Sequence, residues 1–445
     1  MLASMPGMAC AQSREAAIRA TLVDPDHSVA PGCVAGVFQN GNLRQSAASG
    51  FADLASQRPL DTTTLFYGAS LSKQFTALAA ATLIAQGKLG LEDNVRSYLP
   101  ELPAYARPVT VEMLMHHTSG IRDSLGLLRL AGMADVGRAS KEQTLDLLFR
   151  QTDTAFVPGT QYSYSNGGYL LLAEIVARVS GQPFAQYARQ VLFDPMGMKH
   201  AYFLDDGSPR PGTFAHGYVP EGDAFAARDT FPRFSGSGGL MLSLEDLARY
   251  ERDIEHRHRV WTEAVAKIML TPGRLADGTP IDDGKGLAYG GGLHMGRLGG
   301  ESIVRHGGSA EAFKHAYVRL PERHAAFAVL CNRGDWKAAE KLDEVMAAAG
   351  TSPPGYPRTY PSGRFHSKEL DSDYTLVREG SALLARITSP LVAAPRTVRF
   401  EPGEDGAFHA GAMSLWPGTS PDKISVSRGQ SGRIPLTRRT GLEVP

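Results

Sequence analysis

Residues 70–87, SLSKQFTALAAATLIAQG, are the stretch that decides the fold. From Ser72 onward alanine and leucine dominate, which predicts a helix buried on most sides, and Gly87 ends it. Ser70 and Lys73 stand three positions apart at its start, so the hydroxyl and the amine project from one face and can hydrogen-bond. A serine and a lysine so placed at a helix N-terminus are typical of a nucleophile and its base.

The spacing alone does not decide the matter. Lys73 can act as a base only where burial lowers its pKa from about 10.4 toward neutrality. Ser420 and Lys423 repeat the spacing near the C-terminus with no supporting residues around them. In the alternative, structural interpretation, Ser70 is a helix cap and Lys73 is a solvated side chain. Further motifs are therefore needed to decide between the two interpretations.

The composition indicates a globular protein of more than one domain. The chain has 445 residues, 42% of them hydrophobic and 21% charged, which excludes wholesale disorder. Its 46 Lys and Arg balance 46 Asp and Glu, so no basic surface for nucleic acid is expected. The longest apolar helical stretch, residues 75–85, is interrupted by two threonines and is far shorter than the ~20 residues that span a bilayer. We therefore expect no nucleic-acid partner and no membrane span.

Strand patterns flank a helical middle. Residues 33–38, an Asn40-Gly41 turn and the segment from Leu43 predict a β-hairpin. The expected helices are 72–87, 141–151, 168–180, 183–191, 243–255 and 337–349, and the expected late strands are 302–305, 313–320 and 325–331. Strands at both ends of a helical block predict one mixed α/β domain over residues 12–350.

A proline-rich break separates this domain from the end of the chain. Residues 351–362 carry four prolines, which predicts a linker. Beyond it, short strand patterns alternate with Gly, Asp and Ser turns at 374–377, 382–387, 397–400 and 423–426. They predict a small all-β domain over residues 363–445.

Two further motifs support the pair at Ser70 and Lys73. Tyr164-Ser165-Asn166 and then His306-Gly307-Gly308 follow it along the chain. In this order the S-x-x-K, Y-x-N and H-x-G elements resemble the serine β-lactamase and penicillin-binding-protein superfamily. The match is to its class C-like branch of esterases, D-aminopeptidases and D-alanyl-D-alanine carboxypeptidases. The resemblance covers about residues 30–350 and includes landmark segments at 114–120, 157–159, 195–198 and 330–332.

The resemblance implies a fold and a mechanism. The fold is an antiparallel sheet flanked by helices, with a helical subdomain, and the reaction is acyl transfer through an ester on Ser70. Lys73 and Tyr164 would handle the proton. Either a neutral Lys73 takes it from Ser70, or an ionised Tyr164 does so beside a charged Lys73. Both alternatives stay open.

The remaining site residues are assigned to substrate binding by the same resemblance. Asn166 would hydrogen-bond the substrate amide, and the N–H groups of Ser70 and Ser309 would form an oxyanion hole. His306 and Gly308, the matching residues of the H-x-G element, are assigned to substrate binding as well. We expect a small-molecule or short-peptide substrate and no cofactor, and the oligomeric state stays open.

The third motif departs from the lysine-bearing pattern of many relatives. His306 replaces a permanent cation, and Gly307 lacks a hydroxyl, so binding of a substrate carboxylate should weaken. This favours substrates like those of D-aminopeptidases or esterases, and a D-amino-acid-directed peptidase or amidase is the leading prediction. The alternatives are a class C-like carboxylesterase with weak β-lactamase activity and a non-catalytic penicillin-recognising protein.

Several other features are interpreted as structural. His116 and His117 invite a metal site, yet neighbouring residues point to different helix faces and no carboxylate stands at ligand spacing. His256 and His258 lie in a charged run typical of a solvated helix face. The glycine-rich segment 235–239 lacks the Lys-Ser/Thr of a phosphate loop and is interpreted as backbone close to the active site. No metal is expected.

Three expectations concern the periphery of the fold. The family arrangement brings the first strand beside the strand ending near Cys331, so Cys33 and Cys331 are expected to pair. Residues 1–11 resemble the end of a signal peptide, which favours a periplasmic or secreted protein over the cytoplasmic alternative. The tail from Gly363 resembles a small lipocalin-like domain of some relatives, expected to be an accessory without a catalytic base.

Overall fold

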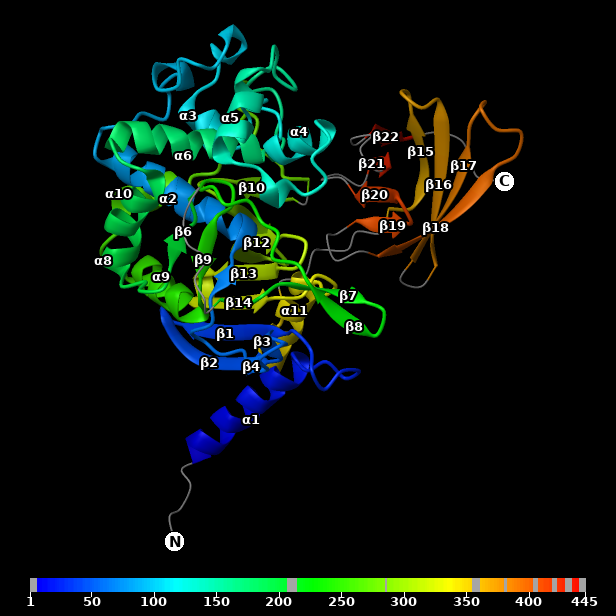
Figure 1. Cartoon of the computed structure of the whole chain (residues 1–445). Coiled ribbons are helices and arrows are strands. Elements are labelled where there is room, and N and C mark those ends of the chain that lie inside the picture. The colour runs from blue at the N-terminus through cyan, green and yellow to red at the C-terminus, as the bar shows by residue number, and fades with distance from the viewer. Residues whose placement is uncertain are drawn as a thin grey trace. The chain divides into compact units, whose positions relative to one another are not determined.

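The structure is a computed structural model, and its chain divides into two units (Figure 1). The first comprises residues 1–297 and 301–353, and the second comprises residues 354–445 together with residues 298–300. It describes residues 6–205, 214–284, 286–353, 361–379, 382–402, 407–417, 422–428 and 434–439. Within these ranges no helix is long and apolar enough to cross a membrane.

A seven-stranded sheet with the order β10-β11-β12-β13-β14-β1-β2 frames the first unit. Its strands are β1 (Cys33–Gln39), β2 (Asn42–Ser49), β10 (Ala288–Tyr289), β11 (His294–Leu298), β12 (Glu301–Ser309), β13 (Lys314–Leu320) and β14 (Ala325–Cys331). β1 pairs antiparallel with both β2 and β14, so strands from the two ends of this unit lie side by side. The Asn40-Gly41 turn has φ of 50° and 68°, as a two-residue hairpin of this type requires.

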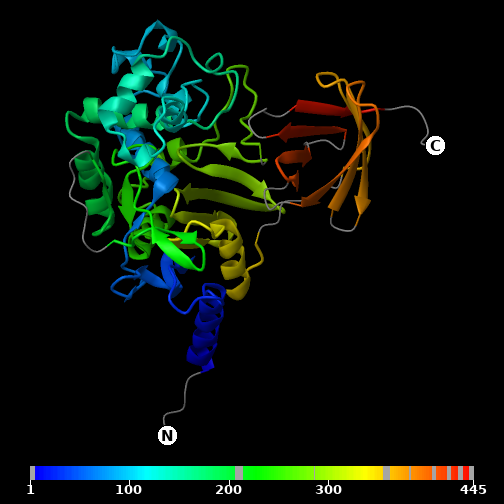
Figure 2. The same cartoon turned by 45° about the vertical axis from the view of Figure 1, so that its right-hand side comes forward.

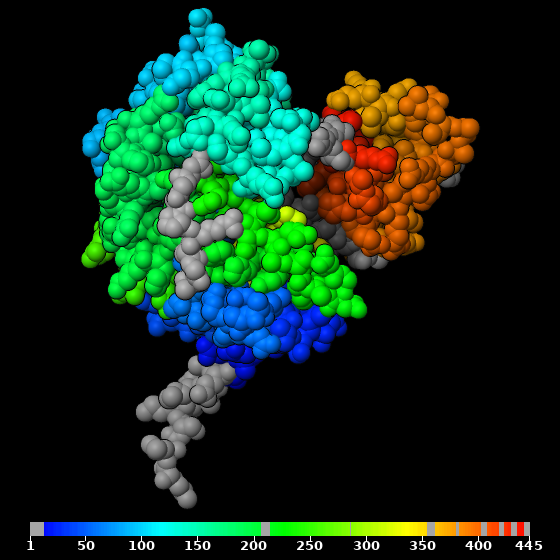
Figure 3. Space-filling model, viewed as in Figure 1, coloured from blue at the N-terminus to red at the C-terminus, as the bar shows by residue number. Residues whose placement is uncertain are grey.

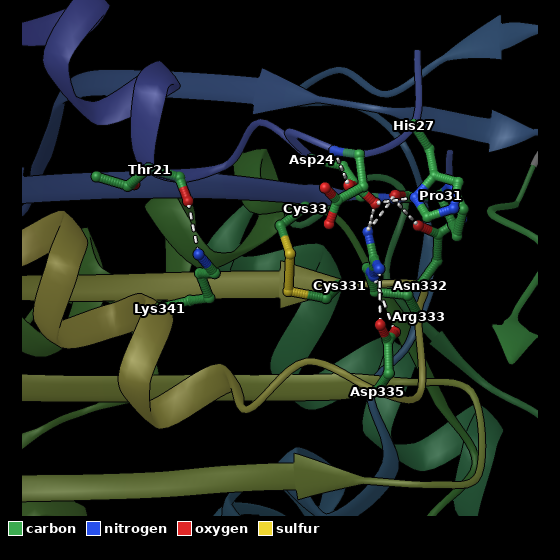
Figure 4. A network of polar contacts seen from close by, with 12 residues as sticks. Thr21, Asp24, His27, Pro31, Cys33, Cys331, Asn332, Arg333, Asp335 and Lys341 are labelled. Atoms are coloured by element: carbon green, nitrogen blue, oxygen red, sulfur yellow. Dashed lines mark hydrogen bonds and ion pairs between the residues drawn. A yellow bond between two sulfur atoms is a disulfide. The ribbon is translucent and has the colours of Figure 1, made fainter. Parts of the chain in front are cut away.

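The disulfide expected between Cys33 and Cys331 is confirmed. The two residues are register partners at the ends of β1 and β14, and their Cα atoms lie 4.1 Å apart. Beside the bond, Arg333 donates to Asp24 and Asp335, each at 2.7 Å (Figure 4). The covalent bond and the buried ion pairs together fix the chain where it enters and leaves the sheet.

β12 is longer than the strand expected at residues 302–305. It continues to Ser309, so the H-x-G motif lies within the strand, with Gly307 opposite Ala316 of β13. A glycine is required at position 308 because the backbone of Gly68 lies where a side chain would otherwise be. A Cβ at Gly308 would lie 2.5 Å from the Gly68 carbonyl oxygen, closer than real Cβ atoms come.

Helices occupy the middle of the first unit, as expected from the sequence. Figure 3 shows this middle part of the chain in cyan and green. The helices are α1 (Pro6–Thr21), α2 (Ser72–Ala85), α3 (Val111–Met115), α4 (Ser124–Leu130), α5 (Lys141–Phe149), α6 (Asn166–Ser180), α7 (Phe184–Ala188), α8 (Asp194–Met196), α9 (Leu244–His256), α10 (Glu263–Met269) and α11 (Ala338–Ala348). α2 packs against α6 and α10, and all its residues from Ser72 to Leu83 are buried.

Shorter elements connect these helices to the sheet. The short strands are β3 (Phe51–Asp53), β4 (Arg58–Pro59), β5 (Phe66–Tyr67), β6 (Tyr202–Phe203), β7 (Tyr218–Glu221), β8 (Ala224–Ala227) and β9 (Leu240–Leu242). The 3-10 turns are Ala69–Leu71, Val95–Ser97, Ala104–Ala106, Val136–Arg138 and Pro321–Arg323, and a π-helical turn spans Arg189–Phe193. The helix expected at 183–191 is therefore α7 followed by this turn.

The second unit is a closed barrel of eight strands in sequential order (Figure 2). They are β15 (Gly363–Ser367), β16 (Ser372–Glu379), β17 (Ala382–Thr388), β18 (Arg396–Pro402), β19 (Phe408–Ala410), β20 (Met413–Pro417), β21 (Lys423–Arg428) and β22 (Ile434–Arg438). Phe365, Leu383, Phe400 and Leu415 are fully buried and belong to its apolar core. The expected mixed α/β fold with a small lipocalin-like β domain is confirmed.

Candidate active site

Ser70 lies in the 3-10 turn that leads into α2. The preceding Ala69 has φ of 47°, a strained value for a residue with a Cβ. The turn is held by Gly68, whose N–H donates to the Leu240 carbonyl at 2.7 Å, and by Ser72, whose hydroxyl donates to the Ala69 carbonyl at 2.6 Å. These contacts place Ser70 on the wall of a pocket of about 340 Å³.

Lys73 lies one turn further along α2 and is fully buried. Its Nζ is 3.2 Å from Ser70 Oγ, 2.8 Å from Asn166 Oδ1 and 3.0 Å from the Ser237 carbonyl oxygen. Burial lowers its pKa to about 7, although the carboxylate of Asp123 opposes part of this shift. A large fraction of Lys73 is therefore an uncharged amine at neutral pH.

The aromatic ring of Tyr164 lies 4.6 Å from Lys73 Nζ. Its hydroxyl is buried and lies near the Ser70 hydroxyl. Burial raises the pKa of Tyr164 well above its ordinary value, and the nearby Ser70 hydroxyl offsets only part of the rise. Tyr164 is thus a neutral phenol at neutral pH, which disfavours the ionised tyrosine left open by the sequence.

Asn166 is the first residue of α6, two positions earlier than the start expected from the sequence. The helix begins here because the Ser165 hydroxyl caps it, accepting from the Gly168 N–H at 3.1 Å. The Asn166 side chain points between Lys73 and Asp123 and also lines the pocket. It can therefore reach both the proton-handling lysine and a bound substrate.

His306 lies on β12 and is buried. Its Nδ1 is 2.6 Å from the Gly307 carbonyl, which can only accept, so Nδ1 carries the proton and Nε2 accepts from the Tyr289 hydroxyl at 3.2 Å. Burial lowers the pKa of His306 well below its ordinary value, and His294 and Lys73 add to the effect. His306 is a neutral imidazole and supplies no cation for a carboxylate.

The structure brings the seven predicted site residues into one region but in two layers. Ser70, Asn166 and Ser309 line the pocket. The other four lie among the groups behind this wall: Lys73, Tyr164, His306 and Gly308. Ser309 is held at the end of β12, where its hydroxyl accepts from Lys314 Nζ at 2.9 Å.

Four further residues complete the site, although none of them was assigned to it from the sequence. The first is Ser237, whose carbonyl oxygen contacts Lys73 because the glycine-rich segment 235–239 runs close to that lysine. The sequence predicts only that this segment is backbone near the active site and does not single out Ser237. At Gly238 a Cβ would lie 2.6 Å from Tyr67 Oη. The others are Asp123, His117 and Tyr289. Asp123 carried one visible signal, its position before an apolar segment where a helix cap is expected.

The adjacent histidines, interpreted from the sequence as structural, make packing and hydrogen-bond contacts, and those of His117 are with site residues. The Ser165 N–H donates to His117 Nδ1 at 3.1 Å, and the ring packs on Tyr164 with centroids 4.3 Å apart. His116 is buried and lies 3.7 Å from Glu112. Within the described ranges no group of three or more His, Cys, Asp or Glu side chains could hold a metal ion.

The remaining candidates lie away from this site or outside the described residues. His256 and His258 are exposed around the C-terminal end of α9, which supports their interpretation as a solvated surface. Lys423 begins β21 of the barrel. Ser420, its partner in the second S-x-x-K spacing, lies outside the described residues.

Comparisons with known proteins establish the family. The sequence profile described as Beta-lactamase matches residues 18–351, so the chain belongs to the beta-lactamase family. A D-aminopeptidase of Brucella ovis is 29% identical over 339 residues, which are 75% of this chain and 62% of the relative. The chain thus spans less than two thirds of the length of that relative.

Solved structures share the fold, and two of them serve as examples. The octameric penicillin-binding protein homologue from Pyrococcus abyssi has a TM-score of 0.66 and 21% identity, and the match covers 92% of this chain and 96% of that one. The D-amino acid amidase from Ochrobactrum anthropi SV3, complexed with L-phenylalanine amide, has a TM-score of 0.63 and 22% identity. That match covers 76% of this chain and 98% of the amidase.

Proposed function

We propose that the protein is a serine hydrolase that forms an acyl-enzyme on Ser70 and acts on amides of D-amino acids. The observation that carries the proposal is the buried contact between Lys73 Nζ and Ser70 Oγ at 3.2 Å. A lysine with its pKa near 7 can accept a proton at physiological pH and return it later in the cycle.

Acylation uses Lys73 as the general base. The Ser70 hydroxyl donates its proton to the neutral amine while its oxygen forms a bond to the acyl carbon. The charge that develops on the carbonyl oxygen is stabilised by the N–H groups of Ser70 and Ser309, each worth about 3–4 kcal/mol in comparable sites. Asn166, on the pocket wall, hydrogen-bonds the amide of the bound substrate.

Breakdown of the intermediate returns the proton. The Lys73 ammonium protonates the leaving amine through the neutral Tyr164 hydroxyl, and the C–N bond breaks. A water molecule then attacks the ester and passes its proton back along the same groups, which releases the acid and frees Ser70. The buried Tyr164 hydroxyl, which lies near the Ser70 hydroxyl, suits such a relay.

The substrate class is inferred from the relatives and from the neutral His306. The curated relatives are named D-aminopeptidase, and a neutral imidazole gives no anchor for a C-terminal carboxylate. Amides of D-amino acids do not need that anchor. The pocket also has apolar walls at Leu125, Val136 and Pro232, which keeps a carboxylesterase as the second candidate.

A substrate panel tests the proposal. We expect D-aminoacyl p-nitroanilides to be hydrolysed with higher kcat/KM than their L-enantiomers, short p-nitrophenyl esters and nitrocefin. A phosphonate probe should add to Ser70, and Ser70→Ala should abolish labelling and turnover at unchanged Tm. Equal rates for both enantiomers with faster ester cleavage would favour the esterase. Labelling at another serine, with activity surviving Ser70→Ala, would contradict the mechanism.

The compartment is a second proposal. We infer that the protein works in an oxidising environment such as the periplasm, because the Cys33–Cys331 disulfide persists only where thiols are not kept reduced. Mass spectrometry of the protein alkylated directly on cell lysis should find both cysteines unmodified. Quantitative alkylation of both would favour the cytoplasm.

A further inference from the structure

Asp123 holds the Asn166 side chain from the side opposite Lys73. Its Oδ1 accepts from the Asn166 backbone N–H at 2.9 Å and from the side-chain Nδ2 at 2.7 Å. Its Oδ2 caps α4, accepting from the Gly126 N–H at 2.7 Å. Three donors thus fix the carboxylate, and the carboxylate in turn fixes the amide.

This arrangement allows only one orientation of the Asn166 amide. The amide oxygen faces Lys73 Nζ at 2.8 Å while the amide nitrogen faces Asp123. After a 180° flip the oxygen would face a carboxylate that can only accept, and the nitrogen would face the lysine. Without the charge on Asp123, a flipped amide could donate to the lone pair of a neutral Lys73.

The fixed orientation matters most when Lys73 has lost its proton. A neutral amine has two N–H groups and one lone pair. Two acceptors surround Nζ, namely Asn166 Oδ1 and the Ser237 carbonyl at 3.0 Å, so both N–H groups are used. The lone pair is left for the Ser70 hydroxyl at 3.2 Å.

We propose that Asp123 is a positioning residue that prevents the Asn166 amide from donating to Lys73 and thereby keeps the lysine lone pair directed at Ser70. The kinetic consequence rests on the proposed function. The orientation of the Asn166 amide and its effect on Lys73 do not rest on the proposed function, because they follow from the contacts alone.

The charge of Asp123 also acts on Lys73 through space. Among the described residues, Asp123 is the carboxylate that raises the pKa of Lys73, and this opposes the lowering by burial. The other titratable groups around Lys73 are neutral at pH 7, because burial raises the pKa of the phenols and lowers that of the imidazoles. They are Tyr164, Tyr169, His117 and His306. Removing the Asp123 charge should therefore shift the titration of Lys73 to lower pH.

Asp123→Asn is the variant that tests the proposal, because it keeps the size of the side chain and removes its charge. We expect the rate of phosphonate labelling at Ser70 to fall about 10- to 100-fold at its plateau, since the base is misdirected. The rising limb of the labelling rate against pH should also move to lower pH. Asp123→Ser, which retains a capping hydroxyl for α4, replaces it if the asparagine variant does not fold.

Ser140→Ala is the matched control. Ser140 caps the neighbouring helix α5 and accepts from the Gln143 N–H at 3.2 Å, so its loss removes a cap in the same helical block without touching Asn166. We expect a similar fall in Tm with labelling rate and pH profile unchanged. A purely structural role for Asp123 predicts that its variants behave like this control, and that result would overturn the proposal.

A measurement on Lys73 itself separates this proposal from the proposed function. NMR of the wild-type chain labelled with 13C at lysine Cε, with Lys73 identified by its loss in Lys73→Arg, follows the amine directly. The titration midpoint should fall in Asp123→Asn whether or not the protein hydrolyses any substrate. An unchanged midpoint together with an unchanged labelling rate would disprove a role for Asp123, whereas failure of the wild type to label at Ser70 would count against the function alone.

Discussion

The two units of the chain bury different kinds of groups. The first unit encloses an amine and several imidazoles, among them Lys73 at 0%, His117 at 1% and His306 at 4% exposure. In the described part of the barrel, the buried polar side chains are only the hydroxyls of Ser367 and Ser372. The first unit also buries charged side chains that pair with one another, such as Glu251 and Arg319.

The difference shows that the first unit gives up folding free energy to keep ionisable groups buried at its site. Burying an ionisable group costs free energy unless it is paired or changes its protonation state. Lys73 meets this cost by losing its proton near neutrality, and the imidazoles by remaining neutral. The barrel residues that the structure describes bury no lysine or histidine, which supports the interpretation of this unit as an accessory domain. Variants that act on one interior and not the other test this contrast.

The largest effect is expected for Lys73→Met, which removes the buried amine. Turnover should fall by several orders of magnitude because the base is lost. Stability should rise, since below pH 7 the folded wild type holds a buried ammonium. The pKa of Lys73 is about 7 in the folded protein and 10.5 for a lysine in water, so the cost of that ammonium is about 5 kcal/mol. Denaturant unfolding and turnover assays measure both effects.

The pH dependence identifies Lys73 as the origin of the gain. Between about pH 7 and 10.5 the unfolded wild type holds a proton on Lys73 that the folded protein has released, so wild-type stability rises with pH. The advantage of Lys73→Met should be greatest below pH 7 and shrink above it. An advantage that does not change from pH 6 to 10 would contradict the lowered pKa of Lys73.

The second largest effect is expected from a matched pair of core truncations. Phe75 in α2 and Phe400 in β18 are both fully buried, so each change to alanine should cost about 3–5 kcal/mol in its own unit. Phe75→Ala should also slow the labelling of Ser70, because its helix carries Lys73. Phe400→Ala should leave the labelling rate unchanged. A loss of labelling in Phe400→Ala would show that the barrel supports the chemical step.

Reduction of the disulfide should have a smaller effect. The Cys33–Cys331 bond closes a long loop, and loss of such a bond typically costs about 2–5 kcal/mol. Cys33→Ser with Cys331→Ala should lower Tm in the first transition and leave the barrel transition in place. A variant as stable as the wild type would show that the ion pairs of Arg333 suffice to hold this edge.

The site was predictable from the sequence where its residues form short motifs. Ser70 and Lys73 lie within one helical turn, and the Y-x-N and H-x-G elements are equally local, so spacing and order identified them. Asp123 and the Ser237 carbonyl act across more than 40 positions. No local pattern encodes such contacts, because a capping aspartate or a backbone carbonyl is the same at any other helix or loop.

The fold was predictable to a similar depth. Hydrophobic patterning found most of the long strands and helices, and β14 matches its expected range. The patterning ended β12 at residue 305 because glycines weaken a strand in isolation. In the structure Gly308 is needed for the close approach of β12 to Gly68, a tertiary constraint that the local sequence does not show.

The smallest effect is expected for His306→Lys, which places a cation where the first unit holds a neutral imidazole. A lysine here should favour ligands with a carboxylate, because a hydrogen bond to a charged group is worth about 1.5–3 kcal/mol. We expect acylation by a penicillin to gain about tenfold relative to acylation by an uncharged ester. The new ammonium should also lower the pKa of Lys73 by repulsion, so the rate should begin to rise at lower pH.

The control for this prediction is His306→Gln, which keeps an acceptor for the Tyr289 hydroxyl without adding a charge. This variant should show neither change. If the glutamine variant gains the same preference, the effect comes from lost packing around Tyr289. If neither variant gains it, the neutral state of His306 does not set the preference for substrates without a carboxylate.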